Sequence, residues 1–156
     1  MPAVGISILL VTKENIGSLG RFDADVFDNP VQAELLTQFV AQQMNHLVVA
    51  VAKEALGSTL EDVTIGMASA ISYVHPDKPL QLFINEVAVA DRYQRQGVGK
   101  RLIEFMLEHG RNLGCTEAWV ATGVSNAPAR ALYAATGGKE DDERAVVYTY
   151  PLVEES

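Results

Sequence analysis

The sequence predicts a single mixed α/β domain that spans residues 1–156. Short apolar runs rich in β-branched residues alternate with segments whose apolar residues recur at helical spacing, and turn-forming residues separate them. Hydrophobic residues make up 48% of the chain and charged residues 21%, which is ordinary for a globular protein and too apolar for a disordered one. The sequence contains no linker, internal repeat or low-complexity segment, so one folding unit is expected.

The charge and the cysteine content argue against several classes of function. The formal net charge of −8 disfavours nucleic acid as a partner, because such binding depends on a broad basic face. A small cationic ligand fits an acidic surface better, although acidity can also serve solubility alone. Cys115 is the single cysteine, so no intrachain disulfide can form, and we expect the chain in a reducing cytoplasm. No cysteine–histidine cluster suggests a metal site.

The N-terminal part of the chain predicts a strand followed by a helix. The apolar run Ile6–Val11 lacks preceding basic residues and is too short to cross a membrane, so a strand explains it better than a signal peptide and no membrane association is expected. Residues 16–27 are expected to form helix and loop. Asp28-Asn29-Pro30 supplies capping and turn residues for a helix over Val31–Gln43. Its apolar face consists of Leu35, Leu36, Phe39 and Val40.

The central part predicts three strands. The β-branched runs His46–Glu54 and Thr64–Val74 flank a turn at Gly57-Ser58, which indicates a hairpin. The loop His75–Pro79 carries two prolines and must leave the sheet. The nearly continuous apolar run Gln81–Val89 is typical of a strand buried on both faces in a sheet interior.

The C-terminal part predicts two helices and two strands. A helix should begin within the glycine stretch after residue 94 and run to about Leu113, where Gly114 ends it. Glu117–Thr122 predicts a strand. Ser125 or Asn126 then caps a short helix over Ala127–Thr136, and Ala145–Tyr150 predicts a final strand.

The segment QRQGVGKRL, residues 94–102, predicts an anion site between a strand and a helix. Its glycines allow a tight turn that brings unpaired N–H groups together at the positive end of the helix dipole. Four basic residues lie within it or just before it: Arg92, Arg95, Lys100 and Arg101. A Walker loop and a dinucleotide fingerprint both fail to match, so an ordinary turn with solvated charges remains the alternative from these residues alone.

Two ordered motifs carry a family resemblance. A Q/R-x-x-G-x-G/A motif follows a strand, with Gln94, Gly97 and Gly99 at its fixed positions. A second block, N-x-P-A-R-A-L-Y-x-x-x-G, begins at Asn126 and ends at Gly137. Together they resemble the GNAT superfamily of acetyl-CoA-dependent N-acetyltransferases, over roughly Thr64 to Tyr150. The resemblance implies a mixed, mostly antiparallel central sheet flanked by helices and splayed at the acetyl-CoA site.

The resemblance also implies which residues bind acetyl-CoA. Backbone N–H groups from Arg95 to Lys100 would hold the pyrophosphate, and Val87 and Val89 would pair with the pantetheine arm. For Asn126, helix capping is the alternative to a contact with the pantetheine amides. The full expected set is Val87, Ala88, Val89, Gln94, Arg95, Gln96, Gly97, Val98, Gly99, Lys100, Asn126, Ala129 and Tyr133.

Two residues are candidates for proton transfer. An amine must lose a proton before it can attack, and Glu86, a carboxylate in an apolar strand, is the candidate general base. The alternative is that Glu86 faces solvent or forms a structural ion pair. Tyr133 stands at the family position of the general acid that protonates the CoA thiolate. Its alternative role is packing on the sheet.

The layout is most similar to aminoglycoside 3-N-acetyltransferases, so a small cationic amine, an aminoglycoside above all, is the expected substrate. It differs from those enzymes in the neutral run Thr122–Ser125. A peptide, protein or polyamine acetyltransferase and a non-catalytic CoA-binding sensor remain open. Dimerisation is common in the family, so a homodimer is one expectation. The expected substrate contacts are Asp25, Asp28, Tyr73, His75 and Glu86.

Overall fold

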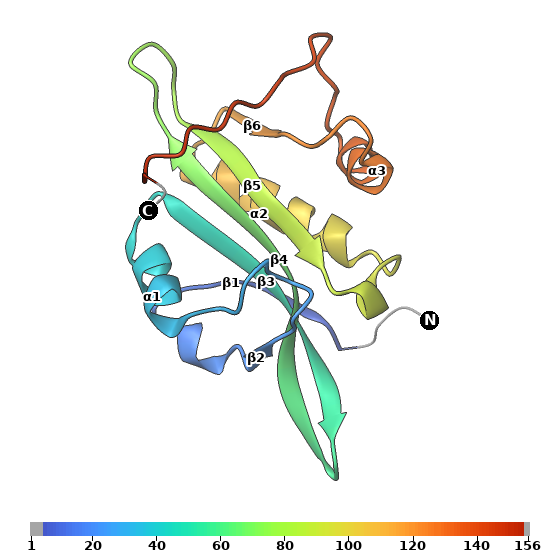
Figure 1. Cartoon of the computed structure of the whole chain (residues 1–156). Helices are drawn as coiled ribbons and strands as arrows, with labels where there is room; N and C mark the ends of the chain where they lie inside the picture. The colour runs from blue at the N-terminus through green and yellow to red at the C-terminus, as the bar shows by residue number, and fades with distance from the viewer. Residues whose placement is uncertain (1–4, 155–156) are drawn as a thin grey trace.

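The computed structural model describes residues 5–154, so the ends of the expected 1–156 domain lie outside it. One sheet holds six strands in the order β1-β3-β4-β5-β6, with β2 beside β4 (Figure 1). The strands are β1 (Ser7–Leu10), β2 (Arg21–Phe22), β3 (Asn45–Leu56), β4 (Thr59–Tyr73), β5 (Gln81–Val89) and β6 (Glu117–Val120). The helices are α1 (Ala33–Ala41), α2 (Val98–Leu113) and α3 (Ala127–Ala135), with short 3-10 turns η1 (Ile16–Ser18) and η2 (Asp91–Tyr93).

The sheet is mostly antiparallel, as expected. The pairs β1–β3, β3–β4 and β4–β5 are antiparallel, whereas β2–β4 and β5–β6 are parallel. The predicted hairpin is confirmed as β3–β4, and Gly57 turns it with a φ of 61° that favours glycine. The predicted bounds of the strand Gln81–Val89 and the predicted end of α2 at Leu113 are also confirmed.

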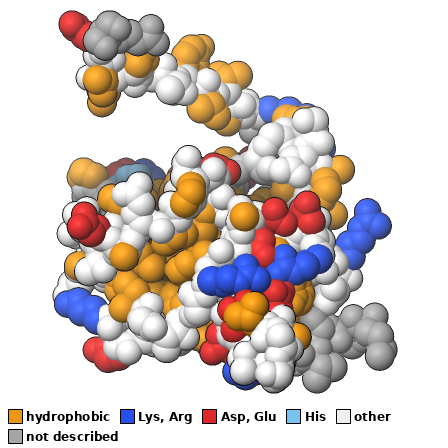
Figure 2. Space-filling view, turned by 60° about the horizontal axis from the view of Figure 1, so that its bottom comes forward, with side chains coloured by type: hydrophobic (Ala, Val, Ile, Leu, Met, Phe, Trp, Pro, Cys, Tyr) orange, Lys and Arg blue, Asp and Glu red, His pale blue; other side chains and the backbone are white. Residues whose placement is uncertain are grey.

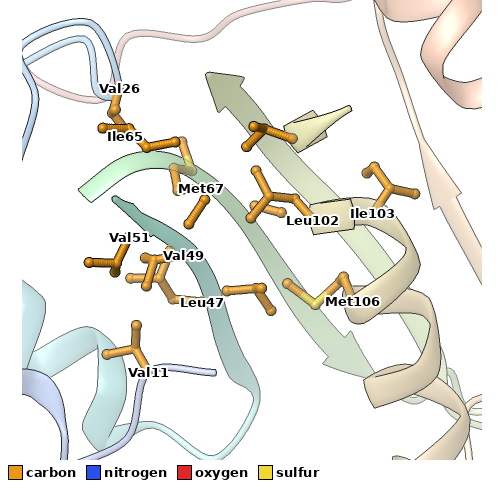
Figure 3. Packing of buried hydrophobic residues seen from close by; sticks show 14 of the residues in the cluster. Val11, Val26, Leu47, Val49, Val51, Ile65, Met67, Leu102, Ile103 and Met106 are labelled. Atoms are coloured by element: carbon orange, nitrogen blue, oxygen red, sulfur yellow. The ribbon is translucent and has the colours of Figure 1, made fainter. Parts of the chain in front are cut away.

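The long helix α2 covers one face of the sheet and forms the main core with it. Leu102, Ile103 and Met106 point from α2 toward the strands (Figure 3) and are almost completely buried. Gly110 fits close to β5, because a Cβ there would lie 3.0 Å from Leu82 Cδ2. This contact fixes α2 against the strand that precedes it, which in turn positions the loop between them.

Three expectations about local structure are wrong. Helix α1 begins at Ala33 rather than Val31, and Leu35 is 57% exposed, so it does not share the buried face of its neighbours. The segment Ala145–Tyr150 forms no strand, and its large apolar side chains are exposed.

In the part of the chain that the structure describes, none of the helices has the length and apolar character needed to cross a bilayer.

A buried histidine pair joins α2 to the sheet. His109 Nε2 lies 2.9 Å from His46 Nδ1, and His46 Nε2 lies 2.8 Å from Ser72 Oγ. Both contacts are compatible with two neutral rings, and the tautomer of each ring decides which atom donates. Burial, together with the charge that His109 would carry, lowers the pKa of His46 to about 4 from its ordinary value of 6.5.

This pair predicts a loss of stability in mild acid. The unfolded chain protonates His46 below about pH 6.5 and the folded chain only near pH 4, so folding stability falls as the pH drops through that window. The expected loss is up to about 3 kcal/mol. Urea unfolding at pH 7 and pH 5 measures this loss as a difference in the free energy of unfolding. In His46→Phe, which has no imidazole to protonate at this position, most of that difference should disappear. A pH dependence in His46→Phe equal to that of the wild type would contradict the assignment.

Candidate functional site

The strands β5 and β6 separate at the middle of β5 and leave one side of it open. Their pairing ends where Ile84 meets Val120, while β5 continues to Val89 with β4 as its only partner among the described residues. A register shift also leaves Asn85 unpaired, because Ser69 opposes Glu86 and the next residue, Ala70, opposes Ile84. The sheet is therefore splayed as expected, with an unpaired strand edge over residues 85–89.

Alternation along β5 shows which backbone groups face this open edge. Ala90 N donates to Ile65 O of β4, so the groups of Val89 and Val87 point the other way. Gln94 Nε2 donates to Val89 O at 3.1 Å from that opposite side. The N–H and C=O groups of Val87 are left available to an extended ligand.

The loop after β5 presents unpaired N–H groups at the start of α2. The first backbone bond of this helix runs from Arg101 N to Gly97 O, and within the described residues no partner accepts from Val98, Gly99 or Lys100 N–H. Gly97 has a φ of 79°, and Arg95 has a φ of 60°, the one positive φ among the described residues other than glycine. Backbone conformations of this kind are concentrated at ligand sites. We refer to residues 95–100, which include these three N–H groups, as the anion cradle.

The two sequence motifs meet at this loop. A Cβ on Gly99 would lie 3.3 Å from Leu132 Cδ2 of α3 and 3.8 Å from Val89 Cγ2 of β5. The second glycine of the first motif thus makes room for a leucine of the second. Asn126 caps α3, since its Oδ1 accepts from Ala129 N at 3.2 Å, which confirms the capping interpretation.

The two candidate proton-transfer residues lie in different environments. Glu86 is exposed beside the unpaired Asn85, and no ion pair or hydrogen bond of its side chain is found in residues 5–154. The expectation of a strand buried on both faces is therefore wrong at Asn85 and Glu86, and of the alternatives for Glu86 the structure shows the one in which it faces solvent. Tyr133 packs against the core from α3, and burial raises the pKa of its phenol, so it stays protonated near neutral pH.

The expected substrate contacts do not form one cluster. Asp25 Oδ2 accepts from Asp91 N at 3.3 Å, which places it at the C-terminal end of β5. Tyr73 pairs with Gln81 at the other end, eight residues or about 27 Å from Val89. The Tyr73 hydroxyl accepts from Trp119 Nε1 at 2.8 Å, and the His75 ring lies 5.0 Å from the Tyr73 ring. Asp28 is exposed in the turn before α1.

The family assignment follows from a match over most of the domain. Residues 22–137, well over half of the chain, match the model of the acetyltransferase (GNAT) family. The chain belongs to the GNAT family. Acetyl-CoA is the acetyl donor in this family, and the mixed sheet seen here is its fold.

Curated GNAT relatives match shorter stretches. Human N-acetyltransferase 8 is 34% identical over 83 residues, which is 51% of this chain and 36% of the relative. The ribosomal protein bS18-alanine N-acetyltransferase of Escherichia coli is 37% identical over 62 residues, 40% of this chain and 42% of the relative. The chain thus matches well under half the length of these relatives.

Solved GNAT structures match the whole fold. An aminoglycoside acetyltransferase from an uncultured soil metagenomic sample has a TM-score of 0.73 at 19% identity, covering 94% of this chain and 96% of its own. The aminoglycoside N-acetyltransferase AAC(6′)-Iy in complex with CoA has a TM-score of 0.68 at 23% identity, covering 93% and 94%. AAC(6′)-Iy is the neighbour whose name gives a position on the aminoglycoside, and that position is 6′. The expected similarity to 3-N-acetyltransferases in particular is therefore not supported.

The residues present fit a CoA pyrophosphate at the N-terminus of α2. Gly97 leaves open space where a Cβ would stand, and the three backbone N–H groups of residues 98–100 have no partner within residues 5–154. In the described part of the chain, no group of three or more histidine, cysteine or acidic side chains could hold a metal ion.

Sequence reasoning missed how the basic residues near the cradle are used. Arg92 pairs with Asp23 and with Glu54, and Lys100 lies 3.8 Å from Glu104. Arg101 Nη2 donates to Ile6 O at 3.0 Å. In the described residues, Arg95 is the one of the four basic residues with no such partner. The positive charge near the cradle that is left for a ligand is therefore smaller than the sequence indicates. Backbone N–H groups make up most of the cradle.

Arg92 joins three segments just before the cradle. It reaches Glu54 on β3 and the buried Asp23 beside β2, while Tyr93 Oη donates to Glu54 Oε1 at 2.9 Å. Burial acts to raise the pKa of Asp23, but hydrogen bonds from Asp25 N and Arg92 outweigh it and hold the pKa below its ordinary value. The hydrogen bond from Arg92 likewise lowers the pKa of Glu54. No local pattern in the sequence indicates these partners, which lie 69 and 38 residues away.

Replacing Arg92 should destabilise the fold. Arg92→Leu leaves the buried Asp23 carboxylate without its cationic partner, at an expected cost of about 1–3 kcal/mol. Denaturant unfolding measures this cost. The matched control is Arg111→Leu, whose exposed ion pair with Glu108 should be worth less than about 1 kcal/mol. Equal effects of the two substitutions would show that the Arg92 network has no special role.

Proposed function

We propose that this GNAT chain transfers acetyl from acetyl-CoA directly to a primary amine of a small cationic substrate, with aminoglycosides as the preferred class. The observation that carries the proposal is the open edge of β5 beside the anion cradle of α2. An extended ligand with a pyrophosphate at one end fits this combination of a free strand edge and free N–H groups. Cys115 supports direct transfer, because burial raises the pKa of its thiol and leaves it a poor nucleophile.

The chain's own residues provide the proton transfers. Acetyl-CoA, when bound, supplies the acetyl group as a thioester. The exposed Glu86 carboxylate accepts a proton from the substrate ammonium, so that the neutral amine can attack. Tyr133 keeps a proton at Oη and serves as the general acid. The Val87 N–H, which lies beyond the end of the β5–β6 pairing, stabilises negative charge on the acyl oxygen in this proposal.

The preference for a cationic small molecule rests on charge and on the structural neighbours. The chain carries a net charge of −8, and Glu86 is accessible at the open edge. Two structures of the soil metagenomic aminoglycoside acetyltransferase, one of them in complex with sisomicin, share the fold of this chain. Glu86 is the substrate contact that we retain. Asp25, Tyr73 and His75 are too widely separated to hold one amino group, although a multi-ring substrate could reach one of them.

A protein N-terminal amine is the second candidate acceptor. The relative named ribosomal protein bS18-alanine N-acetyltransferase is more similar in sequence, at 37% over 62 residues, than the aminoglycoside enzymes. The chemistry at Glu86 and Tyr133 is the same for either amine. The two candidates differ only in what the acceptor side of the site contacts.

Thiol release from acetyl-CoA across an acceptor panel tests the proposal. The panel holds kanamycin- and gentamicin-type aminoglycosides, polyamines, and peptides that begin with alanine. Release with aminoglycosides alone is the expected result, and mapping of the acetylated nitrogen then gives the position. Expression should also raise the tolerance of cells to the accepted drug. Release with peptides alone would favour the second candidate, and tight CoA binding without any acceptor-dependent release would favour a sensor.

A further inference from the structure

Four aromatic rings form one cluster at the end of the sheet where β5 begins. This cluster, here called the platform, consists of Phe83, Trp119, Tyr73 and His75. The Trp119 ring lies 4.4 Å from the Phe83 ring between centroids, and Trp119 Nε1 donates to the Tyr73 hydroxyl at 2.8 Å. The His75 ring lies 5.0 Å from the Tyr73 ring. These contacts fix the rings relative to one another, so that they form one continuous surface.

The platform faces away from the helix α2. Leu82 points toward α2, since a Cβ on Gly110 would lie 3.0 Å from its side chain. Side chains alternate along a strand, so Phe83 points to the other side of the sheet. Trp119 opposes Phe83 on β6 and shares its face, where the Tyr73 hydroxyl reaches it from β4.

The β-bulge in β5 turns the proposed base to the same face. Residues three apart on a regular strand point to opposite sides, and Phe83 and Glu86 are three apart. The extra residue Asn85 reverses this, because Phe83 opposes Ile71 and Glu86 opposes Ser69, two residues away on β4. Glu86 therefore lies on the face of the platform, about 7 Å along the sheet from the row that holds Phe83.

The platform is open to solvent. Trp119 is 43% exposed and Ile71, in the same row of the sheet, is 36% exposed. The C-terminal segment, residues 145–153, projects over the body of the molecule with open space beneath it (Figure 2). A ligand can therefore reach the rings. Exposed apolar surfaces built in this way mark binding sites.

The chemistry of the platform favours a saturated ring that carries ammonium groups. The face of an aromatic ring carries partial negative charge, so it attracts ammonium groups and polarised C–H groups, and tryptophan does so most strongly. An aminosugar ring presents C–H groups on its face and ammonium groups at its rim. The net charge of −8 and the exposed Glu86 carboxylate favour the same cationic ligand.

We propose that the platform binds a second ring of an aminosugar acceptor, while the amine that is acetylated lies on the first ring, at Glu86. This inference rests on the proposed function and adds Trp119 and Phe83 as residues that determine acceptor specificity. Trp119 stacks on the C–H face of the second ring and attracts its ammonium groups. A substrate of two or more rings reaches both Glu86 and the platform, whereas a one-ring amine reaches Glu86 alone.

Tryptophan fluorescence tests contact with the platform directly. Trp119 is the single tryptophan of the chain, and kanamycin-type aminoglycosides have no aromatic ring. Adding such an aminoglycoside to the CoA complex should change the tryptophan emission, with the dissociation constant that calorimetry gives. Glucosamine, with one ring, should cause little change. Calorimetric binding without a change in emission would overturn the platform and leave the proposed function intact. Absence of both binding and turnover with aminoglycosides would overturn both.

Substitution of Trp119 provides an independent test. Trp119→Ala should raise KM for kanamycin-type acceptors about 3- to 30-fold with little change in kcat. The inhibition constant of glucosamine and the KM for acetyl-CoA should not change. Trp119→Phe keeps an aromatic face and should recover most of the loss. The fluorescence test needs no substitution, so it stands even if Trp119→Ala fails to fold.

The matched control is Phe105→Ala. Phe105 is a similarly exposed aromatic residue, at 37%, but it lies on α2 and so on the other side of the sheet. Its replacement should leave KM for every acceptor at the wild-type value. A wild-type KM for kanamycin-type acceptors in Trp119→Ala, or an equal weakening of glucosamine and the multi-ring acceptors, would overturn the proposal.

Discussion

Glu86→Gln lowers kcat/KM for the amine acceptor about 10²- to 10⁴-fold and leaves the affinity for acetyl-CoA unchanged. The amide keeps the shape of the side chain but cannot accept a proton, and a positioned general base is worth about this factor. Because Glu86 is exposed and without a side-chain partner among the described residues, the substitution should not alter the fold. Acceptor-dependent thiol release measures turnover, and titration calorimetry measures the binding of acetyl-CoA.

Two further variants define what a loss of activity at Glu86 means. Glu117→Gln neutralises another exposed carboxylate, on β6, and should leave turnover near the wild-type level. Tyr133→Phe removes the proposed acid while keeping the ring in place, and should also lower turnover. Wild-type turnover in both Glu86→Gln and Tyr133→Phe would refute the acid–base scheme and leave the fold assignment untouched.

Gly97→Val weakens the binding of acetyl-CoA about 10- to 100-fold. Gly97 has a φ of 79°, a conformation that a β-branched residue adopts only at a cost of about 1–3 kcal/mol. The loop of the variant relaxes away from this conformation and must return to it for the ligand, so the cost appears as lost affinity. The valine side chain would also occupy the open space beside the free N–H groups of α2.

The hairpin glycine Gly57 provides a matched control for Gly97. It has a φ of 61° and, like Gly97, has no atom within 4 Å of the position a Cβ would take. It lies in the turn between β3 and β4, outside the cradle. Gly57→Val should therefore cost stability through the same backbone strain but leave the acetyl-CoA affinity unchanged. An equal loss of affinity in both variants would place the effect in global stability rather than in the cradle.

Local sequence patterns predicted the elements that carry the cofactor site. The bounds of β5, the end of α2 at Gly114 and the cap at Asn126 are all encoded within a few residues. The predicted final strand over Ala145–Tyr150 is the exception, because the structure forms no strand there. The run Ala145–Tyr150 encodes a tendency to form a strand, but the partner that would complete its hydrogen bonds is not encoded nearby.

The polar contacts were less predictable, because they depend on strand register and on distant segments. Asp25 and Tyr73 both looked suitable for a cationic substrate, yet the β4–β5 register places them at opposite ends of β5. Arg92 looked like part of a phosphate site until the fold brought Asp23 and Glu54 beside it. Charge counted along the chain therefore overestimated the charge available to a ligand.

The central claim is that the open edge of β5 and the start of α2 form the cofactor site. NMR chemical shifts of the backbone amides, followed during a titration with acetyl-CoA, test it. In an isotope-labelled chain, the largest changes should fall on Val87, on Gly97 and on the free amides Val98–Lys100. The tip of the β3–β4 hairpin around Gly57 should not respond. Absence of binding, or changes confined to residues outside β5 and the α2 N-terminus, would contradict the account.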